Sequence, residues 1–387
     1  MQFVNGRLIL PDEIRAAPLR VAGGRIKKIG GAAGKTASSS TVDLKGGYLA
    51  PGFIDLHIHG AMGRDTMEAS VEAYREITEF HLRGGTTSIA LTTLTAPESA
   101  ILKVLETVRP WHNKSIGAGA RIIGIHVEGP FIALAKAGAQ DPKQIRPPTA
   151  PEWKKYLAFG KLIVEMTVAP EVKGALPLIR ALRRNGTIAS GGHSDATEDH
   201  LQPALEAGLN HATHAFNAMS TITKNGPYRK AGLIEFALAH REIVCELIAD
   251  GVHVPRVLMK MLFNAKGRDG VCIITDATAG AGLPAGTTFS LATIRARVTD
   301  QVAVLEDNTG LAGSTLTMIE GVRRAVQLGD APLVDAVRMA SLNPARQLGR
   351  EKEIGSLAPG KRADLVWFDD KFRVRGVWLD GEPRFRR

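Results

Sequence analysis

Five separate stretches of the chain end an apolar run with a side chain that can bind a metal ion or transfer a proton. Their last residues are His57/His59, Glu128, His193, His214 and Asp276. His57 and His59 are two residues apart, so on a strand both side chains point to one face and can bind the same ion. Imidazole and carboxylate ligands suit zinc, iron and other divalent ions. The pattern is typical of a hydrolytic metal site.

Glu128 follows an apolar run, where a carboxylate is costly to bury unless it is paired or bound to metal. We expect Glu128 to hold one ion or to bridge two. His126 would share its face of the strand, either supporting a ligand through a hydrogen bond or packing in the core. His211 precedes His214 by three residues and lies on the opposite side of a regular strand, so we interpret it as structural.

Asp276 is the candidate acid-base residue. It ends the last apolar run of the series. From that position a carboxylate can take a proton from water that a metal ion has made acidic, and can return the proton to a leaving amine. We therefore assign Asp276 the catalytic role, and we assign metal binding to the other five residues.

Eight apolar, β-branched segments place these residues. They are Tyr48–His59, Thr86–Leu94, Arg121–Glu128, Leu162–Pro170, Thr187–His193, His211–Phe216, Val244–His253 and Val271–Asp276. Apolar residues at three- and four-residue spacing predict intervening helices over Val71–Leu82, Ala100–Val108, Leu176–Arg184, His200–Ala207 and Val257–Phe263. Alternating strands and helices favour parallel β-α units and an α/β fold, the (β/α)8 TIM-type barrel, whose strands gather their carboxyl ends around one mouth.

The two ends of the chain differ from the middle. Short segments punctuated by glycine predict strands at Phe3–Leu10, Pro18–Val21, Arg25–Ile29, Ala363–Phe368 and Phe372–Leu379. We expect both ends to form one small β-sandwich beside the barrel. In the predicted organisation, residues 1–50 begin the sandwich, residues 51–352 form the barrel and residues 353–387 complete the sandwich.

Composition restricts the partners and the compartment. Of the 387 residues 44% are hydrophobic, and the net charge of +10 is spread over the chain without a nucleic-acid motif, so we expect no nucleic-acid partner. Cys245 and Cys272 lie in apolar runs and are interpreted as buried thiols, which suits a reducing cytoplasm. The start of the chain lacks the apolar core of a signal peptide, and no run has the length of a membrane span. We expect a cytoplasmic protein without a membrane partner.

Taken together, the motifs resemble those of the N-acetylglucosamine-6-phosphate deacetylases of the amidohydrolase superfamily. The resemblance covers nearly the whole chain and rests on Pro51–Asp55, His126–Phe131, Gly192–Ser194, Thr213–Met219, Ala249–His253 and Leu311–Ser314. It implies hydrolysis of the acetamide of N-acetylglucosamine 6-phosphate to glucosamine 6-phosphate and acetate. It also implies a homodimer.

The resemblance implies roles for particular residues. Glu128, His193 and His214 would hold the principal ion, zinc or iron, and the intact His57/His59 pair would allow a second. The matching positions for substrate contact are Ala139, Gln140, Asn217, Ala218, Arg229, His253, Leu311, Ala312 and Gly313. The alternative for these positions is loop structure alone.

Two departures from the family pattern leave the substrate open. Gln140 stands where the family usually has histidine, and glutamine cannot carry a proton or a charge. The run 223–232 differs from the family's phosphate-binding arginine segment, so either Arg229 makes that contact or the phosphate is not required. One alternative function is therefore deacetylation or deformylation of another N-acyl amine or amino sugar. A catalytically silent scaffold barrel is the alternative from another class, which the intact ligands and Asp276 disfavour.

Overall fold

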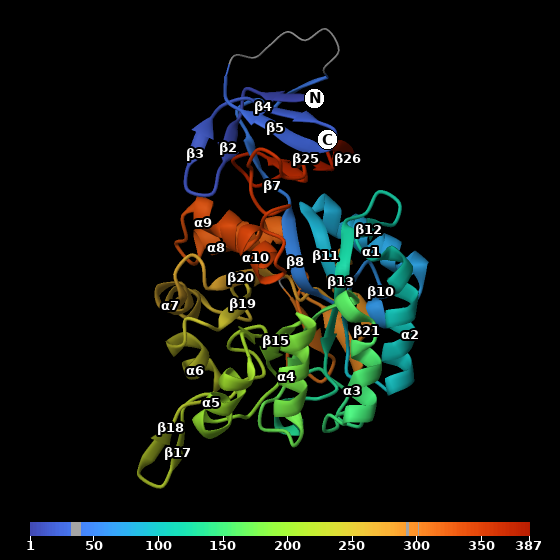
Figure 1. The fold of residues 1–387 in the computed structure, drawn as a ribbon, viewed down its shortest axis with the longest axis vertical. Helices are drawn as coiled ribbons and strands as arrows, with labels where there is room; N and C mark the ends of the chain where they lie inside the picture. The colour runs from blue at the N-terminus through green and yellow to red at the C-terminus, as the bar shows by residue number, and fades with distance from the viewer. Residues whose placement is uncertain (32–39, 292–293, 301) are drawn as a thin grey trace.

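A closed parallel barrel forms the centre of the computed structural model, which describes residues 1–31, 40–291, 294–300 and 302–387. Its strands follow the order β8, β11, β13, β14, β15, β16, β19 and β20 (Figure 1). Their bounds are Phe53–Ile58, Thr86–Thr93, Arg121–Glu128, Ile163–Val168, Ile188–Gly191, His211–Ala212, Val244–Ile248 and Val271–Ile274. The short β12 (Lys114–Ser115) pairs antiparallel with β13 at the edge. The predicted (β/α)8 barrel is confirmed.

The barrel closes between its last and first strands. The backbone N–H of Asp276 donates to the carbonyl of His57 at 2.9 Å, and that of His59 donates to Ala277 at 2.8 Å. A parallel bridge joins Ile58 and Ala277. Closure is therefore made by the same segments that carry three of the predicted site residues.

Helices cover the barrel. They are α1 (Val71–Arg83), α2 (Glu98–Val108), α3 (Ala150–Leu157), α4 (Ala175–Asn185), α5 (Glu198–Ala207), α6 (Leu233–Ala239), α7 (Arg256–Lys266), α8 (Met318–Gln327), α9 (Leu333–Met339) and α10 (Leu342–Gln347). The five predicted helices correspond to α1, α2, α4, α5 and α7. In α1 the Ser70 hydroxyl caps the helix by accepting from the Ala73 N–H, and Tyr74 and Ile77 are buried on the inner face. None of the helices among the described residues combines the length and apolarity needed to cross a bilayer.

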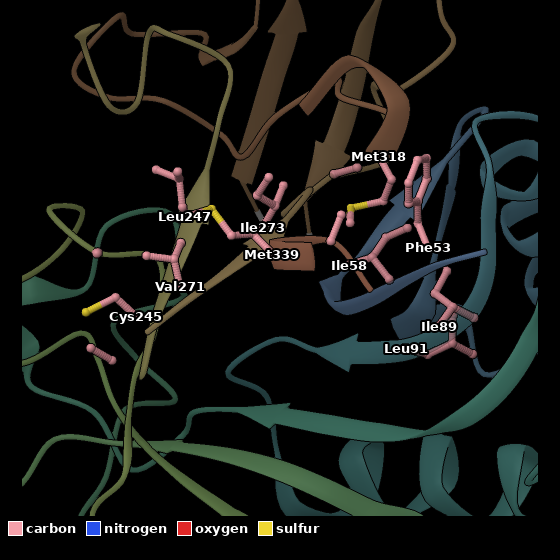
Figure 2. Close-up of a cluster of buried hydrophobic side chains, with 14 of the residues drawn as sticks. Phe53, Ile58, Ile89, Leu91, Cys245, Leu247, Val271, Ile273, Met318 and Met339 are labelled. Atoms are coloured by element: carbon pink, nitrogen blue, oxygen red, sulfur yellow. The ribbon is translucent and has the colours of Figure 1, made fainter. Parts of the chain in front are cut away.

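The main core lies between the strands and the helices. Phe53, Ile89 and Leu247 come from barrel strands, whereas Met318 and Met339 come from α8 and α9, and all five are buried in one cluster (Figure 2). Burying a side chain of this size stabilises the fold by about 1.5–3 kcal/mol. The core therefore fixes the strands whose ends carry the site.

Two terminal sheets bring the ends of the chain together. One sheet has the order β5, β4, β1, β6 and the other β26, β25, β24, β7, β2, β3 (Figure 1). Their bounds are β1 (Gln2–Val4), β2 (Arg7–Ile9), β3 (Ile14–Ala16), β4 (Leu19–Ala22), β5 (Arg25–Ile29), β6 (Thr41–Asp43), β7 (Tyr48–Pro51), β24 (Leu365–Phe368), β25 (Val374–Leu379) and β26 (Glu382–Arg386). Both ends thus contribute to the second of these sheets, as predicted. The boundaries at residues 50 and 352 remain a proposal.

The structure corrects the first predicted barrel strand. Residues 48–59 form two strands, because β7 pairs antiparallel with β24 in the terminal sheet and only β8 belongs to the barrel. Gly52 separates them: its N–H donates to the Asp364 carbonyl at 2.8 Å, and a Cβ at this position would overlap the Thr87 side chain. Close approach of the backbone therefore switches the chain from one sheet to the other.

The sequence also failed to indicate several smaller elements. A three-stranded antiparallel sheet of β21 (Thr288–Leu291), β22 (Ile294–Val298) and β23 (Ala303–Leu305) follows the last barrel strand. The hairpin of β17 (Thr223–Asn225) and β18 (Tyr228–Lys230) projects from the barrel, at the lower left of Figure 1. Strands β9 (Gly60–Ala61) and β10 (Arg64–Asp65) form a second two-stranded pair.

Candidate metal centre

The six predicted catalytic and metal-binding residues meet at the carboxyl ends of the barrel strands. His193, His214 and Asp276 each follow the last residue of a strand, β15, β16 and β20, by two positions. All six residues are buried, with at most 8% of the surface of any of them exposed. The structure thus brings together residues that are far apart in the sequence.

Glu128, His193 and His214 form the first ligand group. The Oε1 atom of Glu128 lies 3.1 Å from Nε2 of His193 and 3.0 Å from Nε2 of His214, and the two Nε2 atoms are 3.1 Å apart. Ligands bound at about 2.0–2.1 Å around one tetrahedral zinc ion lie roughly 3.3 Å from each other. The three atoms are therefore spaced as ligands of a single divalent ion.

His57, His59 and Glu128 form the second group. Nε2 of His59 lies 3.2 Å from Oε2 of Glu128 and 3.2 Å from Nε2 of His57. Oδ1 of Asp276 completes the group, at 3.4 Å from His57 Nε2 and 3.3 Å from His59 Nε2. Because Glu128 presents a different oxygen to His59 than to the first group, its carboxylate can bridge two ions.

Strained backbone surrounds this centre. His193, His214 and Asp276 have φ values of 46°, 32° and 47°. Residues other than glycine rarely adopt this left-handed region, and each instance costs on the order of 1–3 kcal/mol. Such strain collects at functional sites, where the surrounding structure holds it in place.

The histidines and carboxylates of the centre stabilise each other's charged forms. Burial disfavours the charged form of His59, but hydrogen bonds to Asp276 and Glu128 outweigh it and raise the pKa of His59 to about 9. Burial also works against ionised Glu128, yet the charge of His57 and hydrogen bonds from His193 and His214 hold the pKa of Glu128 well below its usual range. The carboxylate is therefore ionised, as a metal ligand must be.

Neighbouring groups orient the imidazoles. Nδ1 of His193 donates to the Lys136 carbonyl at 2.8 Å, so Nε2 is the ring nitrogen that would face an ion. His126 bonds through Nε2 to the Thr167 hydroxyl at 2.8 Å and packs edge-on against the His57 ring, 4.5 Å away between centroids. Burial and the charge of His57 lower the pKa of His126 well below its usual range, so it is neutral.

Gln140 contacts the bridging carboxylate. Its side-chain N–H donates to Oε2 of Glu128 at 2.6 Å, and its side-chain oxygen accepts from the backbone N–H of Thr95 at 2.7 Å. The Thr95 bond fixes which end of the amide faces Glu128. The structure thus places Gln140 on a candidate ligand as well as at the cavity.

A cavity of about 410 Å³ opens above the centre. Its walls include seven predicted substrate positions: Ala139, Gln140, Asn217, Ala218, His253, Leu311 and Gly313. His253 is held by Asp250, whose Oδ2 accepts from Nδ1 at 2.5 Å. The volume is within the range of small-molecule sites.

Two predicted contact residues do not line this cavity. Ala312 is buried behind it, where its carbonyl accepts from the Thr278 hydroxyl at 3.0 Å. Arg229 lies in the exposed β17–β18 hairpin. An arginine on a projecting hairpin contributes nothing to the cavity walls of its own chain, so its contact with substrate stays a prediction.

Other cavity residues were missed by the sequence interpretation. Leu94, Leu291 and Leu305 provide an apolar wall, and Lys136 and Thr278 add polar groups. Thr278 could have been found, since it is two residues beyond Asp276. Leu291 and Leu305 belong to the inserted sheet, and their sequence pattern carries no sign of where that sheet packs.

Comparison with known proteins agrees with this geometry. Residues 48–384 match the Amidohydrolase family. The N-acetylglucosamine-6-phosphate deacetylase of Bacillus subtilis (strain 168) is 40% identical over 321 residues, covering 82% of this chain and 80% of the relative. The crystal structure of the N-acetylglucosamine-6-phosphate deacetylase from Pasteurella multocida has a TM-score of 0.91 at 32% identity, covering 99% of this chain and 98% of that one. The chain belongs to the amidohydrolase family.

Within the family, the chain groups with deacetylases of amino sugar phosphates. The N-acetylgalactosamine-6-phosphate deacetylase of Escherichia coli O157:H7 is also similar, 33% identical over 365 residues that cover 94% of this chain and 93% of the relative. The resemblance inferred from the motifs is confirmed. The chain is a metal-dependent hydrolytic enzyme that cleaves amide bonds.

Proposed function

We propose that this amidohydrolase removes the acetyl group from N-acetylglucosamine 6-phosphate, releasing glucosamine 6-phosphate and acetate. The observation that carries the proposal is the pair of ligand groups sharing Glu128, with Asp276 beside them at the base of a cavity. The B. subtilis and P. multocida relatives are named for this substrate. Relatives named for the galactosamine epimer are 33% and 34% identical, below the 40% of the B. subtilis relative.

The chemistry divides between the ion and the protein. When bound by Glu128 and the histidines, a divalent ion supplies a Lewis acid for the acetyl carbonyl and makes water more acidic. Burial works against ionised Asp276, but the charge of His57 and the hydrogen bond from His59 outweigh it and lower the pKa of Asp276. Asp276 is therefore ionised and accepts the proton of the attacking water, then donates it to the amine as the C–N bond breaks.

The cavity walls would hold the sugar. Nδ1 of His253 is occupied by Asp250, which leaves Nε2 to form a hydrogen bond with a sugar hydroxyl. Asn217 is held by its side-chain amide, which donates to the carbonyls of His214 and Ala215 at 3.3 and 3.1 Å, so its oxygen remains an acceptor for substrate. These contacts select for hydroxyl groups at the cavity.

The phosphate contact requires more than one chain. Lys136 is the one lysine or arginine among the described cavity residues, and it already pairs with Asp195 at 3.5 Å. Tyr228, 75% exposed beside Arg229, and Ile222, 56% exposed before the hairpin, are large apolar groups suited to an interface. The enzyme is a homodimer in this proposal, with Arg229 of one chain reaching the phosphate in the partner's cavity.

The Arg229 contact has a direct test. Arg229→Ala should raise KM for N-acetylglucosamine 6-phosphate at least tenfold and leave turnover of the unphosphorylated sugar unchanged. Lys224→Ala, opposite Arg229 in the same hairpin, is the matched control. An equal loss on both substrates, or a monomer by light scattering, would contradict the role of Arg229 across a dimer.

The alternative of a different N-acyl substrate is favoured by one observation. Both ends of the Gln140 amide are bonded, to Glu128 and to Thr95, so this residue has less to offer a substrate than the histidine usual in the family. Metal identity, zinc or iron in one or two sites, belongs to the same proposal. So does the cytoplasmic location, which the two free, buried cysteines fit.

Steady-state amine release from metal-analysed enzyme tests the proposed function. The substrates are N-acetylglucosamine 6-phosphate, its galactosamine epimer and unphosphorylated N-acetylglucosamine. We expect kcat/KM to favour the glucosamine phosphate over the unphosphorylated sugar at least about a hundredfold, or 2.7 kcal/mol. Indifference to the phosphate, or preference for the epimer, would contradict the proposal.

A further inference from the structure

Glu246 is a buried carboxylate beneath the candidate metal centre that the proposed reaction does not use. It lies within β19, and its side chain is fully buried. Its Oε2 atom is 3.3 Å from Nδ1 of His57 and 3.3 Å from the backbone nitrogen of His214. Burying a carboxylate costs free energy unless the group is paired or hydrogen-bonded, so the contacts of Glu246 indicate what it does.

The contact with His57 determines which ring nitrogen faces the ions. A carboxylate accepts, so Nδ1 of His57 carries the hydrogen and donates it to Glu246. The ring nitrogen left to bind an ion is then Nε2, the atom that lies 3.2 Å from His59 Nε2 and 3.4 Å from Asp276 Oδ1. A carboxylate behind a histidine ligand in this way fixes the ring and makes it a stronger ligand.

The contact with His214 reaches the other ligand group. The same Oε2 accepts from the His214 N–H, and the Glu246 backbone carbonyl accepts from the Ala215 N–H at 2.8 Å. These bonds hold the turn in which His214 has its positive φ. The backbone bond survives any substitution at residue 246, whereas Glu246 is the partner that the structure gives to Nδ1 of His57.

We propose that Glu246 is a positioning residue for the metal centre and that its side chain chiefly maintains the ion site of His57 and His59. The inference rests on the proposed metal-dependent function, which it deepens. Loss of the side chain should weaken the ion held by His57, His59 and Glu128. The ion held by Glu128, His193 and His214 should be retained, because the His214 turn keeps its backbone bond.

Glu165 offers a matched control. It lies on β14 and is fully buried in the same barrel, next to Glu246 and to the Ser190 hydroxyl. Burial and the nearby charge of Glu246 raise the pKa of Glu165 well above its usual range, so its side chain is neutral. Glu165→Gln therefore replaces one neutral group by another in the same interior and removes no hydrogen bond to a candidate ligand.

The test is metal binding by the purified full-length protein, stripped of metal and titrated with Zn²⁺ and with Co²⁺. We expect two ions per chain in the wild type. Glu246→Ala should keep the tighter ion and bind the second ten- to a hundredfold more weakly, the usual effect of losing a partner behind a ligand. The Co²⁺ absorption bands of the second ion should be lost in parallel.

Two further variants complete the test. Glu246→Gln keeps the shape and one acceptor oxygen, so its second-ion affinity should lie between those of wild type and Glu246→Ala, and it provides the measurement if Glu246→Ala fails to fold. Glu165→Gln should bind both ions like the wild type. Wild-type second-ion affinity in both Glu246 variants, an equal loss in Glu165→Gln, or a single ion in the wild type would overturn the inference. Two-ion binding without deacetylation would instead overturn the proposed function alone.

Discussion

The two ends of strand β13 treat buried charge in opposite ways. At its first residue, in contact with the terminal sheets, Arg121 bonds Asp364 at 2.7 Å and Asp380 at 2.8 Å. At its last residue, Glu128 meets four imidazoles, and no lysine or arginine of the described residues pairs with it. Both ends of the strand neutralise a buried charge. Only the Arg121 end does so with a permanently charged side chain of the protein.

This difference separates a structural ion pair from a binding site. An arginine remains charged at any pH that a protein meets, so the pair at Arg121 is permanent. Imidazoles can give up their protons and accept a metal ion instead. The end of β13 that carries Glu128 is therefore able to exchange its positive charge, and the end that carries Arg121 is not.

Replacing Glu128 should produce the largest change. Glu128→Ala removes the residue shared by both ligand groups, so we expect loss of both ions and a fall in kcat/KM on the order of 10⁴-fold, since a metal ion contributes several kcal/mol to catalysis. Elemental analysis and steady-state kinetics measure the two effects. Glu171→Gln is the control, because Glu171 bonds Ser194 and the Asp195 N–H outside the centre. Retention of both ions by Glu128→Ala would end the bridging assignment.

Asp276 tests whether a carboxylate of the centre acts on substrate rather than on the metal alone. Asp276→Asn keeps the shape but cannot accept a proton, so kcat should fall about 10²–10⁴-fold while both ions stay bound. The control is Asp195→Asn, which changes an exposed aspartate paired with Lys136. Near-normal turnover in Asp276→Asn would refute the catalytic role.

At the other end of β13 the expected effect is on folding. Arg121→Met leaves Asp364 buried with fewer partners, and breaking a buried pair in this way costs about 3–5 kcal/mol. We expect the free energy of unfolding to fall by that amount, with kcat per folded molecule unchanged. Arg362→Met, in the same network but 23% exposed, should cost less. If Arg121→Met lost activity without losing stability, the assignment of a purely structural role to Arg121 would be wrong.

Sequence patterns could predict one end of β13 far better than the other. Glu128, His193 and Asp276 each follow an apolar run, and a barrel must gather such strand ends, so the fold and the grouping of these candidate residues followed from the pattern. The partners of Arg121 come from residues more than 240 positions away. No local pattern carries that information.

The residues that the sequence interpretation missed have different physical origins. Residues 48–59 form one continuous apolar run, which predicted a single barrel strand. In the structure residues 48–51 instead pair with β24 and belong to the terminal sheet. Glu246 was available as a signal, since a charged residue inside an apolar strand needs a buried partner. Leu291 and Leu305 offered no such signal, because their contact with the cavity depends on how an inserted sheet packs.

Asp369, in the terminal sheets, gives the smallest effect and shows how a fixed-cation site responds to pH. Burial works against its charge, but bonds from Arg373 and Arg375 outweigh it and lower its pKa to about 2. Because the folded pKa lies below the unfolded value, this stability is present above about pH 3.8 and is lost as pH falls towards 2. Asp369→Asn should therefore cost on the order of 1 kcal/mol at pH 7 after allowance for solvent screening, and the gap should close in acid. Urea unfolding across this pH range measures it, with the exposed Asp370→Asn as control. A gap that persisted at pH 2 would show that Asp369 acts through its shape rather than its charge.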